Sequence, residues 1–470
     1  MRETKRRLET FSFYDRTGLE KHLTKMAEQG WLLEKIGQFF WTYRRIEPKH
    51  LTFCTCCFPK ASAFDPGPSE EQETFYDFCQ HSGWVLAAAS GQLQVFYNEL
   101  PDPVPIETDP ALEVDAIHRS MKKSMIPSQL FLLAVTTLNV FLYVSQLLDD
   151  PVRVLSSTSS LFVGFCWLEV LLLSGVEMVS YFRWHHKAIL AAERGEFLET
   201  KSHRKLQIGC LALLGVGLVY FLLSVFTSGD RVMIAIMTIM LCVYTPGLFL
   251  LANGVKNFLK RKKASARFNM AVTIASIFVA AYAFMGVMVF GILFSSDRGW
   301  FAGDEETYEY NGKTFEFHDD ELPLTVEDLL DVDYEGYIRE RRAEESIFLA
   351  QLDMEQRPRF DAADYKVMPT LEYTITMVRA PFLYDLCRDT FLHQWDDKRN
   401  YWNSAYVPID AAPWGAVEAY QENDAEYGPR KQYLLCYEDR IVEIKFVYEW
   451  EEVTPEQMAV VGERLGQGEY

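Results

Sequence analysis

Residues 126–148 read IPSQLFLLAVTTLNVFLYVSQLL, an uninterrupted run without a charged side chain. An α-helix needs about 20 mostly apolar residues to cross the hydrocarbon core of a bilayer. Four further runs of this kind follow, at residues 161–182, 206–227, 232–252 and 270–294. The sequence therefore predicts a membrane α-helical bundle of five spans.

The positive charges between these runs predict the orientation of the chain in the cell membrane. Residues 119–123 just before span one, the loop between spans two and three, and the loop between spans four and five carry 15 Lys and Arg residues, whereas the opposite side carries three near the helix ends. Basic residues collect on the cytoplasmic side of multi-pass proteins. We therefore expect a cytoplasmic N-terminus and, after five spans, an extracytoplasmic C-terminus.

Charge also divides the chain into three regions. Residues 1–124 hold 15 basic and 18 acidic residues, residues 125–299 hold 15 and 9, and residues 300–470 hold 16 and 39. We expect a cytoplasmic α+β domain at 1–115, the transmembrane bundle at 116–295 and an acidic extracytoplasmic α+β domain at 296–470. The strong negative charge argues against nucleic acid as a partner, since a phosphate backbone would be repelled.

The N-terminal region has an internally repeated pattern. Each half is expected to form a strand, a helix, a Gly-Trp pair and two further strands, with the pairs at residues 30–31 and 83–84. Glycine suits the left-handed residue after a helix, and the following tryptophan can pack into the core. The pattern predicts two βαββ units that share one sheet, with the first strand at residues 10–14.

Three stretches in the first half carry a resemblance to a known family. They are residues 18–23 (GLEKHL), 26–33 (MAEQGWLL) and 40–43 (FWTY). Here the chain resembles a bacterial membrane-protein family known only as a domain of unknown function, in which this module precedes a few spans. The resemblance implies a gene often found beside a PadR-type transcriptional regulator, and hence a regulatory or envelope-stress context. It implies no catalytic residue.

The C-terminal region shows separate strand and helix signals. Asn311-Gly312 lies between two strand-like segments and favours a tight hairpin. Residues 346–353 and 370–378 alternate as strands do, and residues 381–395 have a helical pattern. Thr454, with Pro455 and Gln457, predicts the start of a last helix through a capping box. The many Tyr and Trp residues either fill a core or line a binding surface.

Two carboxylates fall inside predicted span two. Glu169 is near its middle and Glu177 is toward its cytoplasmic end. Ionisable groups inside a membrane are costly, so each is a candidate for a proton, cation or lipid-headgroup site. The alternative is a buried interhelical hydrogen bond for Glu169, for instance to Asn139 or Gln146, and snorkelling to the interface for Glu177.

The cysteine pattern offers one possible disulfide and argues against a metal site. Cys387 and Cys436 are the two cysteines in the external domain, where a disulfide would persist and stabilise by up to about 4 kcal/mol. The cytoplasmic cysteines lack paired Cys-x-x-Cys spacing, and the adjacent His185 and His186 point about 100° apart on a helix. We expect no metal and no cofactor.

A basic cluster lies just before predicted span five. It consists of Lys260, Arg261, Lys262 and Lys263. Such a cluster contacts anionic lipid head groups, marks the cytoplasmic side, or does both. Membrane lipids are therefore expected partners of this chain.

The layout of the chain favours a regulator over an enzyme. Two folded domains flank a bundle, and the sequence contains no phosphate-binding glycine loop, His-Glu-x-x-His or Gly-x-Ser-x-Gly motif. We expect a non-enzymatic membrane regulator or sensor that couples an extracytoplasmic ligand or partner to a protein partner on the cytoplasmic side. The alternatives are a transport component or accessory subunit that uses Glu169, and a membrane enzyme that acts on lipid or cell wall.

Overall fold

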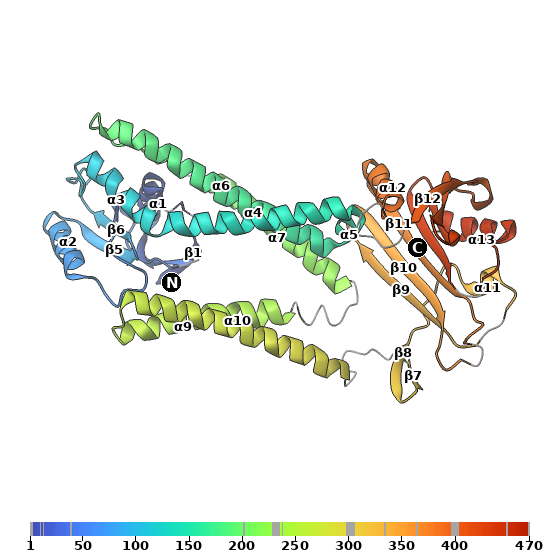
Figure 1. Cartoon of the computed structure of the whole chain (residues 1–470). Helices are drawn as coiled ribbons and strands as arrows, with labels where there is room; N and C mark the ends of the chain where they lie inside the picture. The colour runs from blue at the N-terminus through green and yellow to red at the C-terminus, as the bar shows by residue number, and fades with distance from the viewer. Residues whose placement is uncertain are drawn as a thin grey trace. The chain divides into compact units, whose positions relative to one another are not determined.

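The chain folds into two compact units, residues 1–140 with 166–298 and residues 141–165 with 299–470 (Figure 1). Two helices, α4 (Met125–Asp149) and α6 (Thr158–Ala192), begin in one unit and end in the other. The computed structural model describes residues 3–9, 11–12, 14–37, 40–200, 203–227, 236, 238–297, 306–332, 335–362, 365–395, 404–447 and 450–468.

The N-terminal domain repeats one topology twice. Its elements are β1 (Thr4–Leu8), α1 (Arg16–Glu28), β2 (Trp31–Lys35), β3 (Phe40–Arg45), β4 (Thr52–Cys57), α2 (Glu70–His81), β5 (Val85–Ser90) and β6 (Leu93–Asn98). The strands form two antiparallel sheets with the orders β1-β3-β2 and β4-β6-β5. The duplicated βαββ pattern is thus present, but the prediction of one shared sheet is wrong.

The two repeats nevertheless share one hydrophobic core. Leu19, Leu23 and Met26 of α1 are buried together with Phe53 of β4 and Val95 of β6. Because α1 packs against the sheet of the second repeat, the apolar faces of both repeats are buried between them. Neither repeat has a complete core of its own, so the module folds as one domain.

The two Gly-Trp pairs follow helices α1 and α2. Gly30 and Gly83 have φ angles of 82° and 83°, so the expected left-handed glycines are present. Trp84 is buried, as expected, beside Phe96 of β6. Trp31 is only half buried, because its ring lies at the sheet surface with the Lys5 ammonium 5.2 Å from the ring centre.

The helices that follow the N-terminal domain include candidates for membrane spans. After α3 (Pro110–Lys123) and α4 come α5 (Pro151–Ser156), α6, α7 (Arg204–Thr227), a π-helical turn at Met240–Tyr244, α9 (Thr245–Arg261) and α10 (Ala266–Asp297). Four segments are long and apolar enough to cross a membrane, namely Met125–Asp149, Thr158–Ala192, Arg204–Thr227 and Ala266–Gly291. The chain thus has the helices of a multi-pass membrane protein.

The predicted span at residues 232–252 is only partly covered, because most of residues 228–237 lie outside the described residues.

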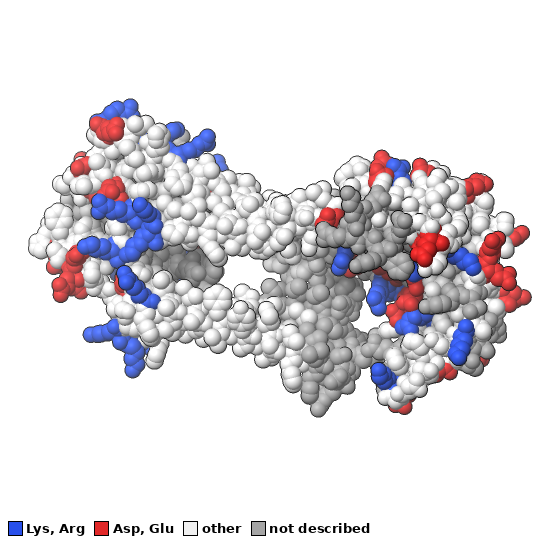
Figure 2. All heavy atoms as spheres, in the orientation of Figure 1, with Lys and Arg blue, Asp and Glu red and all other residues white. Residues whose placement is uncertain are grey.

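On the face seen in Figure 2, Lys and Arg gather over the N-terminal domain and the adjoining helix ends. The visible sides of the helices beyond these ends are largely free of charge, as a lipid-facing surface requires.

The second unit is built on a seven-stranded antiparallel sheet of order β12-β13-β14-β15-β11-β10-β9. Its strands are β9 (Tyr337–Glu345), β10 (Leu349–Pro358), β11 (Thr370–Val378), β12 (Ser404–Ile409), β13 (Glu418–Asp424), β14 (Gly428–Cys436) and β15 (Arg440–Val447). Its helices are α11 (Val326–Leu329), α12 (Tyr384–Leu392) and α13 (Pro455–Gly466), with 3-10 turns at Pro381–Leu383 and Ala412–Trp414. A separate hairpin pairs β7 (Glu306–Tyr310) with β8 (Lys313–Phe317).

Several local predictions for this unit are confirmed. Asn311 and Gly312 both have positive φ angles, of 50° and 74°, as a two-residue hairpin turn requires. Thr454 accepts a hydrogen bond from the backbone N–H of Gln457, whose side chain accepts one from Thr454 N–H. Helix α12 is shorter than the expected 381–395, because its first three residues form a 3-10 turn.

Several aromatic residues of the C-terminal domain belong to its core. Trp414, Tyr433, Phe446 and Trp450 are buried in one cluster, and their rings stand 4.8–6.0 Å apart in three consecutive pairs. Trp450 also donates an indole hydrogen bond to the Thr370 carbonyl. Of the two interpretations drawn from the sequence, the core interpretation therefore fits these residues.

The opposite face of the sheet holds the turn between α4 and α6. Val152 of α5 is buried against Leu349 of β10. Thr158 donates a 2.7 Å hydrogen bond to the Glu345 carbonyl, and Ser346 donates one to the Leu155 carbonyl. The turn is thus built into the C-terminal domain by apolar and polar contacts, within the second unit.

Candidate functional site: the junction of the N-terminal domain with the membrane helices

A buried carboxylate ties the N-terminal domain to helix α7. Glu9, directly after β1, has a side chain with no solvent exposure. It accepts hydrogen bonds from Arg204 Nη2 at 3.1 Å and Tyr43 Oη at 3.2 Å, and His22 Nε2 lies 3.0 Å away. Arg7 Nε lies 3.4 Å from the same carboxylate. Because Arg204 is the first residue of α7, this network fixes the domain to the start of that helix.

The surroundings of Glu9 hold its carboxylate in the charged form. Burial by itself would raise the pKa of Glu9, but the hydrogen bond from His22 and the positive charges of Arg7 and Arg204 outweigh it, so the pKa lies below the ordinary value. Burial and the neighbouring Glu9 charge raise the pKa of Tyr43. Tyr43 therefore keeps its proton and stays a donor to Glu9.

A second set of hydrogen bonds holds the segment between α6 and α7. Thr200 donates through its hydroxyl to Asp15 at 2.7 Å, and its hydroxyl accepts from the backbone N–H of Thr17 at 3.1 Å. Asp15 also caps α1 by accepting from Gly18 N–H. The same carboxylate thus starts helix α1 and positions the α6–α7 segment.

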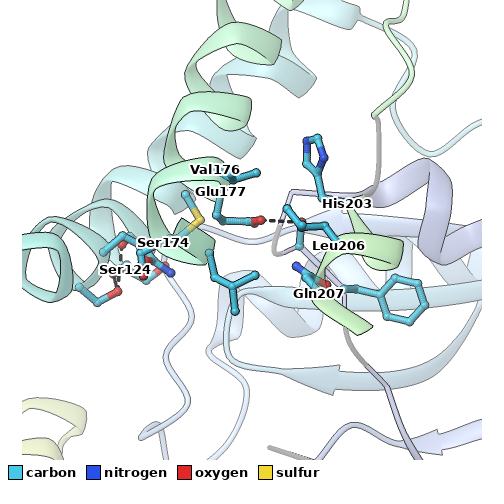
Figure 3. Close-up of a pocket in the computed structure, with 13 residues that line it drawn as sticks. Ser124, Ser174, Val176, Glu177, His203, Leu206 and Gln207 are labelled. Atoms are coloured by element: carbon cyan, nitrogen blue, oxygen red, sulfur yellow. Dashed lines mark hydrogen bonds between the residues drawn. The ribbon is translucent and has the colours of Figure 1, made fainter. Parts of the chain in front are cut away.

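Glu177 meets the N-terminal domain inside a cavity of about 460 Å³. Ser12 donates a 2.8 Å hydrogen bond to the Glu177 carboxylate. Figure 3 shows Glu177 extending from α6 towards Leu206 and Gln207 of α7. The lining comes from α4, α6, α7 and the segment after β1, and comprises Phe11, Ser12, Ser124, Met125, Ser128, Gln129, Leu173, Ser174, Val176, Glu177, His203, Leu206 and Gln207.

Stacked aromatic rings join α3 to α6 beside this cavity. Tyr181 is buried, its ring centre lies 5.5 Å from that of Tyr14, and its hydroxyl lies 2.9 Å from His118 Nδ1. The His118 ring stacks on His185 at 4.1 Å. His185 of α6 is therefore packed against helix α3. The strand expected at residues 10–14 lies partly outside the described residues; Ser12 and Tyr14, which are described, are not in a strand and contact α6.

A third polar cluster surrounds Arg16. Its guanidinium lies 2.7 Å from Glu113, 3.0 Å from Glu107 and 3.8 Å from Glu20. Burial, which outweighs the attraction of Arg16, raises the pKa of both Glu20 and Glu107. Three carboxylates thus share one cation, and the cluster ties α1 to α3 and to the segment before α3.

The two carboxylates predicted within span two have different surroundings. Glu177 is half buried and accepts a hydrogen bond from Ser12 of the N-terminal domain. Glu169 is 7% exposed, and its Oε1 has no hydrogen-bond partner in the described part of the chain. Cys210 of α7 is a neighbour of this carboxylate. Asn139, an expected partner, donates instead to the Val135 carbonyl of its own helix.

The predicted basic cluster follows the end of α9. Lys260 and Arg261 are the last two residues of the helix, and Lys263 has a positive φ angle of 56°. Burial and the charge of Lys256 lower the pKa of Lys260, while Asp65 of the N-terminal domain opposes this. The cluster, completed by Lys262, therefore lies at the same side of the first unit as the N-terminal domain, and its contact with lipid stays a prediction.

The two cysteines of the C-terminal domain lie in one cluster. Cys387 of α12 and Cys436 of β14 are both buried there as free thiols. Burial raises the pKa of Cys387 to about 11 and that of Cys436 to about 12. Protonated thiols of this kind react slowly, and their pairing stays a prediction. Within the described residues, no group of three His, Cys, Asp or Glu side chains could hold a metal ion.

Residues 16–128 match a protein family described as "Protein of unknown function (DUF2812)". The match begins at α1, covers the Arg16 cluster and both Gly-Trp pairs, and ends in the first turn of α4. No curated protein and no solved structure matches the chain. The similarity to an uncharacterised family thus covers most of the N-terminal domain's side of the junction.

The sequence did not reveal Glu9, His22 and Arg204 as a site. Glu9 and Arg204 are separated by 195 positions, and each lies in a polar stretch that resembles ordinary surface. A single sequence has no periodic or motif signal for such a pair. Glu177 was found because a carboxylate stands out in an apolar run.

Replacing Glu9 with Gln should lower the stability of the junction by about 1–3 kcal/mol at neutral pH, since Arg204 and His22 lose a charged acceptor. Because the folded pKa of Glu9 lies below the ordinary 4.5, its stabilisation is fully present above that pH. It is lost as the pH falls through the lower folded pKa. Amide hydrogen exchange in β1 and α1 of the detergent-solubilised chain, corrected for intrinsic rates, measures both effects.

Glu199→Gln is the matched control. Glu199 forms an ion pair with Lys21, and the two side chains are 74% and 63% exposed. The loss of stability in this variant should therefore stay below about 1 kcal/mol. An unchanged acid dependence of exchange in the Glu9→Gln variant would contradict the role given to Glu9.

Proposed function

We propose that this protein is a non-enzymatic, membrane-embedded regulator or sensor. In this proposal residues 300–470 meet a ligand or partner outside the cell, and the N-terminal domain holds or releases a protein partner in the cytoplasm. The observation that carries the proposal is that the α4–α6 hairpin contacts a different soluble domain at each of its ends.

The contacts of the hairpin lie at both ends of α4. Met125, at its start, is buried with Tyr14 of the N-terminal domain. Val152, directly after its end, is buried with Leu349 of the external sheet. The 25 residues of α4 correspond to about 37 Å of helix, enough to cross a bilayer. If α4 crosses, the domains at its two ends lie on opposite sides of the membrane.

Opposite sides require an odd number of crossings between the two domains. Four candidate spans lie in the described residues, so the proposal needs a fifth, for which residues 232–252 are the candidate. The fifth span would place the N-terminus in the cytoplasm and the C-terminus outside, as the distribution of basic residues favours.

Reporter fusions at Tyr470 test this topology. An export-dependent phosphatase should be active there, and a cytoplasm-only fluorescent protein should be dark. The same two reporters placed before residue 3 supply the control, with the reverse result expected. Fluorescence at the C-terminus would put both soluble domains in the cytoplasm and remove the transmembrane sensor.

Signal passage through the hairpin is supported by its contacts with the external sheet. Ser346 bonds to the Leu155 carbonyl of the α4–α6 turn, and its hydroxyl also accepts from the N–H groups of Phe348 and Leu349. A polar cleft of about 920 Å³ opens beside the same turn, lined in part by Asp149, Arg153 and Gln394. A ligand bound there would touch the turn directly.

Ser346→Ala should therefore alter the N-terminal domain at a distance. We expect amide exchange in residues 193–200 and in α1 to rise at least twofold in the full chain, because the hairpin loses anchoring at its external end. Thr374→Val is the control, since Thr374 bonds only within the sheet, to Asp353. If the change stays confined to the residues around 346, the two domains are not coupled.

The alternative function is a transport component or accessory subunit. It is favoured by one observation, the buried Glu169 carboxylate whose Oε1 lacks a partner. Carboxylates inside a membrane often mark ion or proton paths. On this alternative, Glu169→Gln should abolish proton or cation flux in proteoliposomes while the fold, measured by thermal unfolding, is retained. Flux equal to that of protein-free vesicles in the wild type would exclude it.

A further inference from the structure

The cavity around Glu177 contains polar atoms whose hydrogen bonds are missing. Gln129 of α4 and Gln207 of α7 both line it, and each has a buried side-chain Oε1 without a partner in the described part of the chain. Buried polar atoms are almost always paired, so two unpaired amides in one cavity call for a bound group. An amide oxygen accepts hydrogen bonds, so the missing group is a donor.

The charge of the lining selects the kind of donor. Among the lining residues, all of which the structure describes, Glu177 is the one carboxylate and none is Lys or Arg. A phosphate or carboxylate ligand would be repelled by Glu177, whereas a cation would be attracted. A primary ammonium combines a positive charge with three N–H donors, which matches one carboxylate and two amide oxygens.

The apolar part of the lining indicates where the ligand comes from. Leu173, Val176 and Leu206 line the cavity, and Leu206 is still 37% exposed. The next apolar residues on the helices, Leu172 and Ile208, are 51% and 50% exposed. This exposed apolar surface belongs to candidate spans and would face lipid. The cavity is therefore continuous with a surface that acyl chains cover.

We propose that this cavity binds the ammonium head group of an aminophospholipid of the phosphatidylethanolamine class. The ammonium would donate to Glu177 and to the amide oxygens of Gln129 and Gln207, while the acyl chains lie along α6 and α7. The lipid phosphate would stay at the cavity mouth, where the exposed Lys205 precedes Leu206 on α7. Because Glu177 also accepts from Ser12, the bound lipid would share an acceptor with the N-terminal domain.

Phosphatidylcholine gives a sharp comparison. It has the same phosphate and glycerol, but its quaternary ammonium carries no N–H donor. The full-length protein, delipidated in a mild detergent, is titrated with dihexanoyl phosphatidylethanolamine and with dihexanoyl phosphatidylcholine. Binding is read by native mass spectrometry and by the shift in thermal unfolding. We expect the ethanolamine lipid to bind at least tenfold more tightly.

Glu177→Gln tests the carboxylate with little change in shape. It should weaken phosphatidylethanolamine binding at least tenfold and leave phosphatidylcholine binding unchanged. Glu169→Gln, the same substitution on the same helix but outside the cavity, should change neither. If Glu177→Gln does not fold, Gln207→Leu replaces it, with at least a threefold loss for phosphatidylethanolamine expected.

Three results would overturn the proposal. They are equal binding of the two lipids, phosphatidylethanolamine binding that survives both cavity variants, and free ethanolamine binding as tightly as the lipid. The last would identify a soluble amine as the ligand.

The proposal does not depend on transmembrane coupling. Lipid binding is measured directly on the protein, whereas coupling is measured by amide exchange in the N-terminal domain. Either can fail without the other.

Discussion

A buried carboxylate must be surrounded by cations and donors, because an uncompensated charge in the protein interior costs several kcal/mol. Glu9 meets this requirement with groups from three separate parts of the chain, His22 on α1, Tyr43 on β3 and Arg204 at the start of α7. The requirement therefore does more than stabilise the domain. It fixes which end of which membrane helix the N-terminal domain binds, and with that it brings Ser12 to Glu177 and Thr200 to Asp15.

The hairpin of α4 and α6 contacts the N-terminal domain at one end and the C-terminal sheet at the other. Its apolar middle suits lipid, and its polar contacts are concentrated at the two ends, where it meets separate domains. A helix keeps its backbone hydrogen bonds inside a membrane and resists bending. A displacement at one end is therefore transmitted along the helix more readily than through a loop. This physical property of a helix is what the proposed function would use.

Glu169 and Glu177 are two carboxylates on the same helix that have different surroundings. Both are carboxylates on α6, separated by about two helical turns. Glu177 lies where the N-terminal domain closes over the helix ends, so it has a hydroxyl partner and borders a mixed polar and apolar cavity. Glu169 lies between helices and has a thiol as its neighbour. The tertiary surroundings, rather than the residue type, separate a candidate ligand site from a buried polar group.

The sequence by itself determined the features that depend on local patterns. Long apolar runs predicted the four described helices that are long and apolar enough to cross a membrane, Asn311-Gly312 the hairpin, Thr454 the last helix, and the repeated pattern the duplicated topology. These follow from neighbours in the chain or from the length of a run. Tertiary structure alone decided that the repeats form two sheets with one core and that Glu9 meets Arg204. The reason is that burial and charge pairing depend on distances between segments, which a single sequence does not contain.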